Sequence, residues 1–333
     1  MMMECLTGQR NNLATVQAWL IKLIYLLALF FTLLAPQIAT AAPRPDPVAV
    51  VKSVLNAPEA RLDYLEAQIA FDRLFDPAAD PVAMRRVVER LTAAARSLAG
   101  ERPSDGVKFD AIRKVVYTSG PWNDHRPFAY DLTDPKGQKP GSQRLSTYLR
   151  TRRGNCVSMP ILLLIIANRM GMTVNLAAAP LHLFVRYTLP TTGKAYNIEA
   201  TNGGTLARDI WYRQNFPISD RAMESGIYMR VLAKREGIAT MANSVVETLI
   251  NQGAYQQAVD VTDAILIINP RESHAILKRG TAIGHMIRVE FTYRFPGEAL
   301  ISSALQPRYR WLIAQNASMF AKAEALGWIE EKG

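Results

Sequence analysis

A nearly continuous aliphatic segment, Val157 to Ala167, lies in the middle of the chain and is followed by Gly171. A helix that is apolar on every side is stable only where other elements cover all of it, and glycine is a common helix stop. Pro160 falls within the first turn of such a helix, where a missing N–H costs least. The segment therefore predicts a central helix buried inside a sizeable core.

Helical patterns dominate the sequence before this segment. Asp80 before Pro81 is typical of an N-cap with a first-turn proline, and Gly100 is a stop signal. Apolar spacing predicts helices over residues 48–56, 59–75, 81–98, 110–117 and 142–150. The Pro- and Gly-rich residues 119–141 are predicted to form an ordered surface loop, which is in a position to act as a lid over the residues that follow.

Strand patterns follow the aliphatic segment. Residues 176–187 and 195–200 are predicted strands, joined at Pro190 to Gly193. If residues 189–192 form a four-residue loop, then His182 faces Glu199 directly, and directly opposed residues share one face of a sheet. A further short strand is predicted over residues 227–232 in an otherwise helical region.

The sequence after residue 239 has the pattern of a helical repeat. Residues 240–250 and 255–268 form a predicted helical pair, closed by Asn269-Pro270. The pair matches a tetratricopeptide repeat, whose small and apolar positions correspond to Gly253, Tyr255, Ala258, Leu266 and Pro270. A second unit is predicted from residues 273–286 and 310–326. One clear repeat is too few for a free solenoid, so it should pack on the preceding domain.

The amino-terminal residues 1–41 resemble a signal peptide. The apolar stretch Leu23 to Ala35 is 13 residues long, follows Lys22 and ends near Ala39-Thr40-Ala41, a small-x-small cleavage pattern. About 20 residues are needed to cross a bilayer as a helix. We expect an exported, periplasmic protein with a linker over residues 42–52; an uncleaved membrane tether is the alternative.

The charge of the chain limits its partners. Removal of residues 1–41 takes away two cations and one acid, which changes the formal charge from +10 to +9. The cations are scattered, and no basic run predicts a nucleic-acid partner. A basic surface in an envelope can meet anionic lipids or acidic wall polymers, or it can simply be solvated.

Cys156 is the only cysteine that remains once Cys5 is removed. Exported proteins usually pair their cysteines, so an unpaired one is a candidate nucleophile, although it can also be a small buried hydrophobe. If Asn155 caps the aliphatic helix, Cys156 lies in its first turn, where the helix dipole favours a thiolate. His182 can then share its proton, and Glu199 can orient the imidazole.

Each member of this predicted triad also has a structural explanation. His182 can be a core histidine, Glu199 can pair with Arg186, and Cys156 can be inert packing. The three residue types in the order Cys, His, acid, on helix, strand and strand, favour a site. The backbone N–H of Cys156 is one candidate arm of an oxyanion hole.

Three polar residues near Cys156 are candidates for supporting roles. Gln143 and Tyr148 are candidate donors of the second oxyanion arm, and Asn155 is a candidate supporting residue. His125, His274 and His285 lack metal-ligand spacing, and no glycine-rich phosphate loop occurs. We therefore predict no metal and no cofactor.

Three segments resemble the transglutaminase-like superfamily, and look closest to its bacterial SirB-type branch, in which such a core precedes tetratricopeptide repeats. The segments are residues 152–160, 180–187 and 198–204, and the similarity covers roughly residues 53–270. It implies a papain-like α+β fold, with a central helix packed on an antiparallel sheet, over residues 53–239, including a helical N-terminal subdomain. A tetratricopeptide-like region would then occupy residues 240–333.

The resemblance also assigns roles. It implies that Cys156 is the nucleophile, His182 the base and Glu199 the orienting acid, a position at which the superfamily usually has Asp. We expect an amide-bond hydrolase or acyltransferase with a thioacyl intermediate, acting on a peptide or protein amide. The alternative is a silent periplasmic scaffold that binds a protein partner through residues 240–333. Membrane contact is expected only through an uncleaved signal segment.

Overall fold

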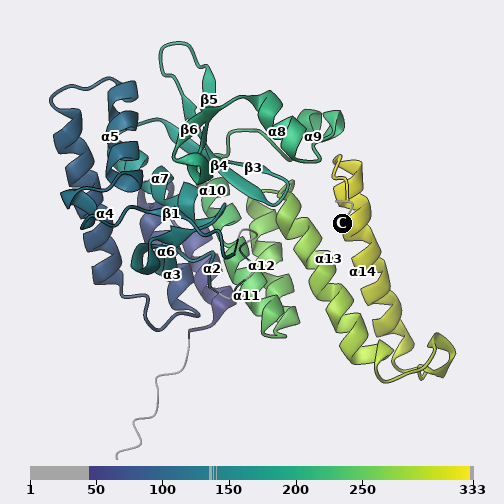
Figure 1. Ribbon diagram of the computed structural model, residues 1–333. Helices are drawn as coiled ribbons and strands as arrows, with labels where there is room; N and C mark the ends of the chain where they lie inside the picture. Colours follow the sequence, from purple (N-terminus) through teal and green to yellow (C-terminus); the bar gives the residue numbers. More distant parts are fainter. Residues whose placement is uncertain (1–44, 135–136, 138, 140, 331–333) are drawn as a thin grey trace, which may run out of the picture. The chain divides into compact units, whose positions relative to one another are not determined.

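The computed structural model describes residues 45–134, 137, 139 and 141–330 (Figure 1). The chain divides into two compact units, Met1–Arg44 and Pro45–Gly333, and only the second contains described residues. The predicted signal peptide, residues 1–41, therefore lies outside the described residues, as does the start of the predicted linker. None of the described helices is long and apolar enough to cross a membrane.

The N-terminal part of the second unit is helical, as the sequence predicts. Asp80 caps α4 (Pro81–Ala99) by accepting the N–H of Val82 (2.9 Å), and Gly100 ends the helix at φ +76°. The helix predicted over residues 110–117 begins five residues earlier, at Asp105, because Ser104 caps it. The helices of this part are α2 (Pro47–Leu55), α3 (Tyr64–Arg73), α4 (Pro81–Ala99), α5 (Asp105–Tyr117) and α6 (Leu145–Thr151), with short 3-10 turns at Glu59–Arg61 and Pro121–Asn123.

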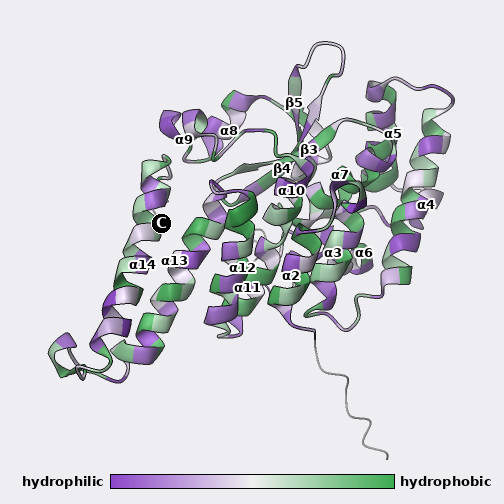
Figure 2. Cartoon of the chain, turned by 180° about the vertical axis from the view of Figure 1, so that it is seen from behind, coloured by the Kyte–Doolittle hydropathy of each residue, from purple (hydrophilic) through white to green (hydrophobic). Residues whose placement is uncertain are grey.

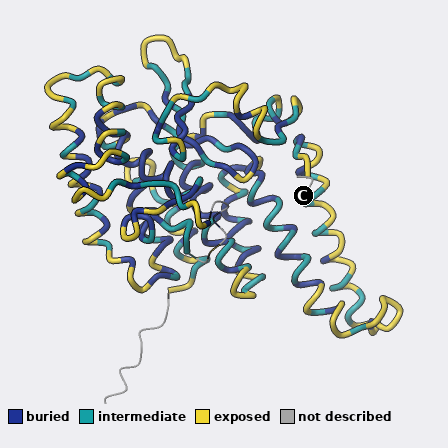
Figure 3. The backbone as a smooth tube through the Cα atoms, in the orientation of Figure 1, coloured by how far each residue is buried: buried dark blue, intermediate teal, exposed yellow. Residues whose placement is uncertain are grey.

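The aliphatic segment forms the central helix α7 (Ser158–Arg169). Every residue from Ser158 to Ala167 is buried, and Pro160 is its third residue, inside the first turn. The helix contacts α3, α4, α5 and α6 as well as the sheet. Figure 3 shows buried residues concentrated in this middle region and exposed residues along the C-terminal helix α14 (Gln306–Ala325) and the loop before it.

A four-stranded antiparallel sheet packs against α7. Its strands are β3 (Val174–Ala179), β4 (His182–Thr188), β5 (Ala195–Glu199) and β6 (Thr205–Ala207), in that spatial order. A central helix packed on an antiparallel sheet confirms the predicted α+β fold class.

Two strand predictions need correction. Residues 176–187 form two strands, β3 and β4, because the chain reverses at Pro180-Leu181, where Leu181 has φ +52°. The continuous apolar pattern concealed this two-residue turn. Residues 227–232 form no strand: Met229 and Leu232 each donate one N–H to β3, but Met229 has φ +62°, which interrupts extended pairing.

The predicted register between the next two strands is shifted by two. Val185 lies opposite Ile198, so Phe184, and not His182, is opposite Glu199. The loop consists of residues 190–193, because Leu189 already pairs with Lys194. A shift of two keeps each side chain on its predicted face, since side chains alternate with a period of two. His182 and Glu199 therefore lie diagonally on the same face.

Two very short strands precede the central helix and were not predicted. β1 (Ala129–Tyr130) pairs in parallel with β2 (Arg153–Gly154), so the Pro- and Gly-rich loop is tied to the segment that leads into α7. The N–H of Asp131 extends this pairing by donating to the carbonyl of Gly154 (2.7 Å). The described part of the loop is thus ordered, as expected.

Consecutive antiparallel helices form the C-terminal part. The helical pair predicted around Gly253 is present, and Gly253 has φ +76° in the turn. The assignment to tetratricopeptide repeats stays a prediction.

Figure 2 shows hydrophobic and hydrophilic residues mixed along α14. The helices after the sheet are α8 (Asp209–Asn215), α9 (Asp220–Ser225), α10 (Lys234–Met241), α11 (Asn243–Asn251), α12 (Tyr255–Ile268), α13 (Ser273–Ile287) and α14 (Gln306–Ala325), with a π-helical turn at Arg288–Thr292 and a 3-10 turn at Glu298–Leu300.

The end of the described chain returns to the sheet. Ser219 and Ser225 of the α9 region donate side-chain hydrogen bonds to the carbonyls of Gly327 (2.6 Å) and Leu326 (2.7 Å). Trp328 packs against a second buried cluster that includes Phe184 and Tyr212. The last helix is therefore connected to the elements that carry the candidate site.

Candidate functional site

Cys156 lies in the turn that leads into α7. The helix begins at Ser158, so Cys156 is two residues before it, and the prediction that Cys156 occupies its first turn was wrong by that margin. Asn155 nevertheless accepts the backbone N–H groups of Val157 (3.0 Å) and Ser158 (3.2 Å), as a capping side chain does. Within the part of the chain that the structure describes, the backbone N–H of Cys156 donates no hydrogen bond.

The backbone of this turn packs closely against two buried side chains at Gly154. A Cβ atom at Gly154 would lie 2.6 Å from the Tyr148 ring and 2.9 Å from Met159 Cγ, so only glycine fits. Tyr148 is fully buried, and burial raises the pKa of its hydroxyl, which has no hydrogen-bond partner among the described residues. The Tyr148 ring thus packs directly against the backbone at Gly154, two residues before Cys156.

Gln143 supports the loop beside Asn155. Its Nε2 donates to the carbonyl of Gly137 (3.2 Å), and a Cβ at Gly137 would lie 2.7 Å from Asn155 Nδ2. Asn155 Nδ2 also donates to Ser142 Oγ (3.3 Å). Gln143 and Asn155 therefore belong to one contact network next to Cys156, and in the described structure neither Gln143 nor Tyr148 has a hydrogen bond to the thiol.

The β3–β4 turn brings His182 to Cys156. The N–H of Leu183 donates to the carbonyl of Cys156 (3.3 Å), and Cys156 Sγ lies 3.5 Å from the carbonyl oxygen of Leu181. His182, the first residue of β4, is close enough to Cys156 for the thiol to raise the pKa of its imidazole. The left-handed conformation of Leu181 is thus what turns His182 towards the thiol.

Glu199 holds the other side of the imidazole. His182 Nε2 lies 2.8 Å from Glu199 Oε2, and both side chains are buried. Because Glu199 occupies Nε2, Nδ1 is the ring nitrogen left for Cys156. Tyr212 donates its hydroxyl to the same carboxylate oxygen (2.9 Å), and Thr201 donates its N–H (3.0 Å) and hydroxyl to Oε1.

The electrostatics of the three residues are coupled. Burial lowers the pKa of His182, but the hydrogen bonds and charges of Cys156 and Glu199 outweigh burial and raise it to about 9. Burial raises the pKa of Glu199, and His182 together with Thr201 lowers it below its ordinary value. A protonated His182 and an ionised Glu199 at neutral pH follow from these directions.

Aromatic side chains cover the imidazole. Phe216 lies 4.9 Å from the His182 ring, centroid to centroid, and Tyr212 lies 6.1 Å away. Trp211 packs on both of these rings and is 39% exposed. The imidazole is therefore shielded from water on this side, next to a partly exposed indole.

Sequence reasoning missed two hydrogen-bond donors to Glu199. Thr201 had a local signal, because a hydroxyl two residues after a carboxylate commonly bonds back to it in a turn. Tyr212 had none, since α8 reaches Glu199 only through the tertiary fold. Among the described residues, no group of three or more His, Cys, Asp and Glu side chains is placed to hold a metal ion.

Comparison with known proteins places the site in a family context. Residues 83–214 match the transglutaminase-like superfamily. The chain is 24% identical over 231 residues to SirB1 of Salmonella typhimurium, which covers 68% of this chain and 76% of SirB1. It is 26% identical over 140 residues to the UPF0162 protein YchA of Escherichia coli strain K12, and this alignment covers 41% of this chain and 51% of YchA. No solved structure matches.

Proposed function

This chain carries a transglutaminase-like domain and is similar to SirB1 over most of its length, and from that premise we propose that it is a cysteine-dependent enzyme acting on amide bonds. In this proposal Cys156 is the nucleophile, His182 carries the proton and Glu199 orients the imidazole. The observation that carries it is the arrangement of the three side chains: His182 Nε2 lies 2.8 Å from Glu199 Oε2, and Cys156 is close enough to raise the pKa of the imidazole.

The protonation of His182 supports this assignment. Burial opposes its charge, but Cys156 and Glu199 raise its pKa to about 9, so the imidazole keeps its proton at neutral pH. An imidazolium next to a sulfur favours the thiolate, which is the nucleophilic form of cysteine.

The reaction proceeds in two halves. The Cys156 thiolate attacks the carbonyl carbon of a carboxamide or peptide bond, and the negative charge that develops on oxygen is stabilised by the free backbone N–H of Cys156. His182 then donates its proton to the departing nitrogen, the C–N bond breaks, and a thioacyl intermediate forms. Neutral His182 next takes a proton from water or from an amine, which attacks the thioester and releases Cys156.

Hydrolysis and acyl transfer share every step up to the thioester. The distinction depends on which acceptor reaches it, and we propose a peptide or protein amide as the acyl donor in either case. Both reactions on a glutamine side chain release ammonia, so mass spectrometry of a glutamine-containing peptide incubated with and without putrescine separates the two. A mass gain equal to putrescine minus ammonia indicates transfer, and deamidation or backbone cleavage indicates hydrolysis.

The first test is the alkylation rate of Cys156 by iodoacetamide at pH 7. Trypsin cleaves after Arg153 and Arg169, so mass spectrometry of the peptide 154–169 reports Cys156 separately from Cys5. We expect fast alkylation in the wild type and a loss of about tenfold or more in His182→Ala, because the thiolate loses its positive partner.

A matched control is available in the helical region. His274 also pairs with a glutamate, Glu247, at 2.8 Å. His274→Ala should leave the alkylation rate unchanged. A slow rate that is equal in the wild type and both variants contradicts the enzyme proposal and favours a scaffold that binds a protein partner through residues 240–333.

We also propose, from the sequence of residues 1–41, that the protein is exported and cleaved to a periplasmic form. Amino-terminal sequencing of the protein purified from separated cell fractions tests this. A start near residue 42 in the periplasmic fraction supports export, and an intact Met1 in the cytoplasmic fraction contradicts it.

A further inference from the structure

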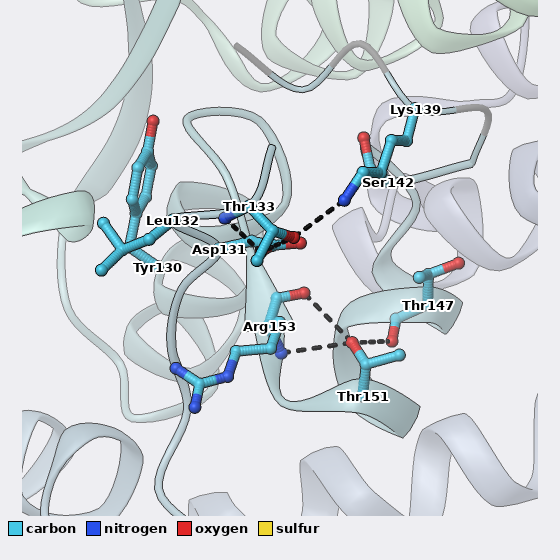
Figure 4. Close-up of a pocket in the computed structure, with 9 residues that line it drawn as sticks. All are labelled: Tyr130, Asp131, Leu132, Thr133, Lys139, Ser142, Thr147, Thr151 and Arg153. Atoms are coloured by element: carbon cyan, nitrogen blue, oxygen red, sulfur yellow. Dashed lines mark hydrogen bonds between the residues drawn. The ribbon is translucent and has the colours of Figure 1, made fainter. Parts of the chain in front are cut away.

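A cavity of about 560 Å³ opens beside the loop that precedes Cys156 (Figure 4). Its volume lies in the range of small-ligand sites, about 300–1,000 Å³. In Figure 4, Lys139 and Ser142 lie on one side of it, Tyr130 and Leu132 on another, and Arg153 with Thr151 below. The lining residues are Tyr130, Asp131, Leu132, Thr133, Lys139, Ser142, Thr147, Thr151 and Arg153.

The cavity wall is continuous with the segment that carries the thiol. Ser142 accepts a hydrogen bond from Asn155, the neighbour of Cys156 (3.3 Å), and Asp131 donates to the carbonyl of Gly154 (2.7 Å). Burial raises the pKa of the lining residue Tyr130, and the charge of Cys156 raises it further. A ligand in the cavity therefore contacts the wall that is hydrogen-bonded to Gly154 and Asn155, the two residues before Cys156.

The charged groups in the lining favour an anion. Lys139 and Arg153 form no ion pair with a carboxylate among the described residues; the Lys139 ammonium instead donates to Thr133 Oγ1 (2.8 Å). The one lining carboxylate, Asp131, already accepts the N–H (2.9 Å) and hydroxyl (2.7 Å) of Thr133. Two of the lining residues are cations and one is an acid, and charge-assisted hydrogen bonds to carboxylates are the strong ones. The neighbouring acid Asp134, which is not part of the lining, accepts the backbone N–H of Lys139 (3.0 Å).

We propose that this cavity binds a carboxylate of the substrate, so that the enzyme selects an acidic peptide or protein segment next to the amide that Cys156 attacks. The inference rests on the proposed function, because it assigns the substrate class of that same site. Lys139 and Arg153 are the groups that recognise the acidic side chain, and the threonine hydroxyls supply further donors.

The experiment compares two capped pentapeptides by calorimetry on the full chain carrying Cys156→Ala, which binds without reaction. One is Glu-Ala-Gln-Ala-Glu, and in its neutral counterpart glutamine replaces both glutamates. We expect the acidic peptide to bind about tenfold more tightly at low salt, and this preference to shrink at about 0.5 M NaCl because exposed charges are screened.

The variants identify the cavity as the source of the preference. Lys139→Gln and Arg153→Gln, each made singly, should weaken it, whereas Arg310→Gln, the same loss of one charge on the exposed face of α14, should preserve it. Equal binding of both peptides, or an equal loss of preference in the Arg310→Gln control, overturns the inference.

A second readout separates this inference from the proposed function. In the wild type, the acidic peptide should protect Cys156 from iodoacetamide better than the neutral one. A reactive thiol with no difference in protection overturns the cavity assignment alone. An unreactive thiol overturns the proposed function, whatever calorimetry reports.

Discussion

Glu199 forms hydrogen bonds with His182, Thr201 and Tyr212 of the candidate site. A glutamate is one methylene longer than the aspartate usual at this position, yet its carboxylate reaches His182 at 2.8 Å. Tyr212 and Thr201 occupy the rest of its hydrogen-bonding capacity, so the longer side chain is held in one place. The reach of the glutamate, which the sequence left open, is settled by these neighbours.

At this scale we predict that Glu199→Gln slows amide turnover by about 10²–10⁴-fold, because a neutral amide no longer stabilises the imidazolium. Steady-state kinetics on the glutamine peptide, with alkylation of Cys156 as a second readout, measures this. Glu247→Gln, in the other His-Glu pair, is the matched control. Full turnover by Glu199→Gln would remove Glu199 from the mechanism.

The pH dependence of stability follows from His182. Its pKa is raised from 6.5 to about 9 in the folded protein, because the partners Cys156 and Glu199 outweigh burial. The stabilisation is fully present below pH 6.5, where the unfolded chain is also protonated, and is lost as pH rises through about 9. We expect the Tm of the wild type to fall more steeply than that of His182→Gln between pH 6.5 and 9. Parallel curves for the two proteins would contradict the raised pKa.

The turn before α7 depends on close packing around Gly154. Gly154 has no room for a Cβ, since the Tyr148 ring and Met159 lie within 3 Å of where it would stand. The short strand β2, the buried Tyr148 and the start of α7 are therefore packed as one unit. Cys156 is two residues along from this contact.

We predict that Gly154→Ala destabilises the fold by about 1–3 kcal/mol, the usual cost of overpacking a core. Urea unfolding measures it, and Cys156 alkylation should slow as the turn shifts. Gly106→Ala is the control. A Cβ at Gly106 would have Ser104 Oγ as its nearest neighbour, at 3.9 Å, and a Gly to Ala change in a helix should be neutral or stabilising. Equal stability of the two variants would contradict the close packing.

At the scale of the whole molecule, the C-terminal helices and the site share a core. Trp328 and Leu326 pack against the buried cluster that contains Phe184 and Tyr212, and Tyr212 is a donor to Glu199. The chain thus passes through α10 to α14 and returns to support the elements around His182. The described end of the chain is part of the structure that positions the site.

We predict that Gly327→Ala destabilises the protein by about 2–5 kcal/mol, because Gly327 has φ +97° and a Cβ would meet the Ala222 backbone at 2.3 Å. Thermal unfolding measures this, and Cys156 alkylation should slow as Tyr212 loosens. Gly297→Ala, with open space at its Cβ position and no positive φ, is the control. A destabilised Gly327→Ala variant whose Cys156 is alkylated at the wild-type rate would contradict support through the shared core.

The sequence by itself determined the features that depend on local pattern. The order of Cys156, His182 and Glu199, predicted on a helix, a strand and a strand, pointed to the candidate site. The aliphatic run specified the buried α7, and the pair Asp80 and Gly100 specified the ends of α4. These succeed because burial periodicity and capping are properties of neighbouring residues.

Only the tertiary structure decided how distant segments pair. The Pro180-Leu181 reversal, the two-residue shift that places Phe184 opposite Glu199, and the arrival of Tyr212 at the carboxylate all depend on contacts far apart in the chain. An alternation with a period of two specifies the face of a strand and not its register, so patterns alone permit several pairings. In the structure, β3 and β4 pack against α7, and in the observed register His182 reaches Glu199 at 2.8 Å.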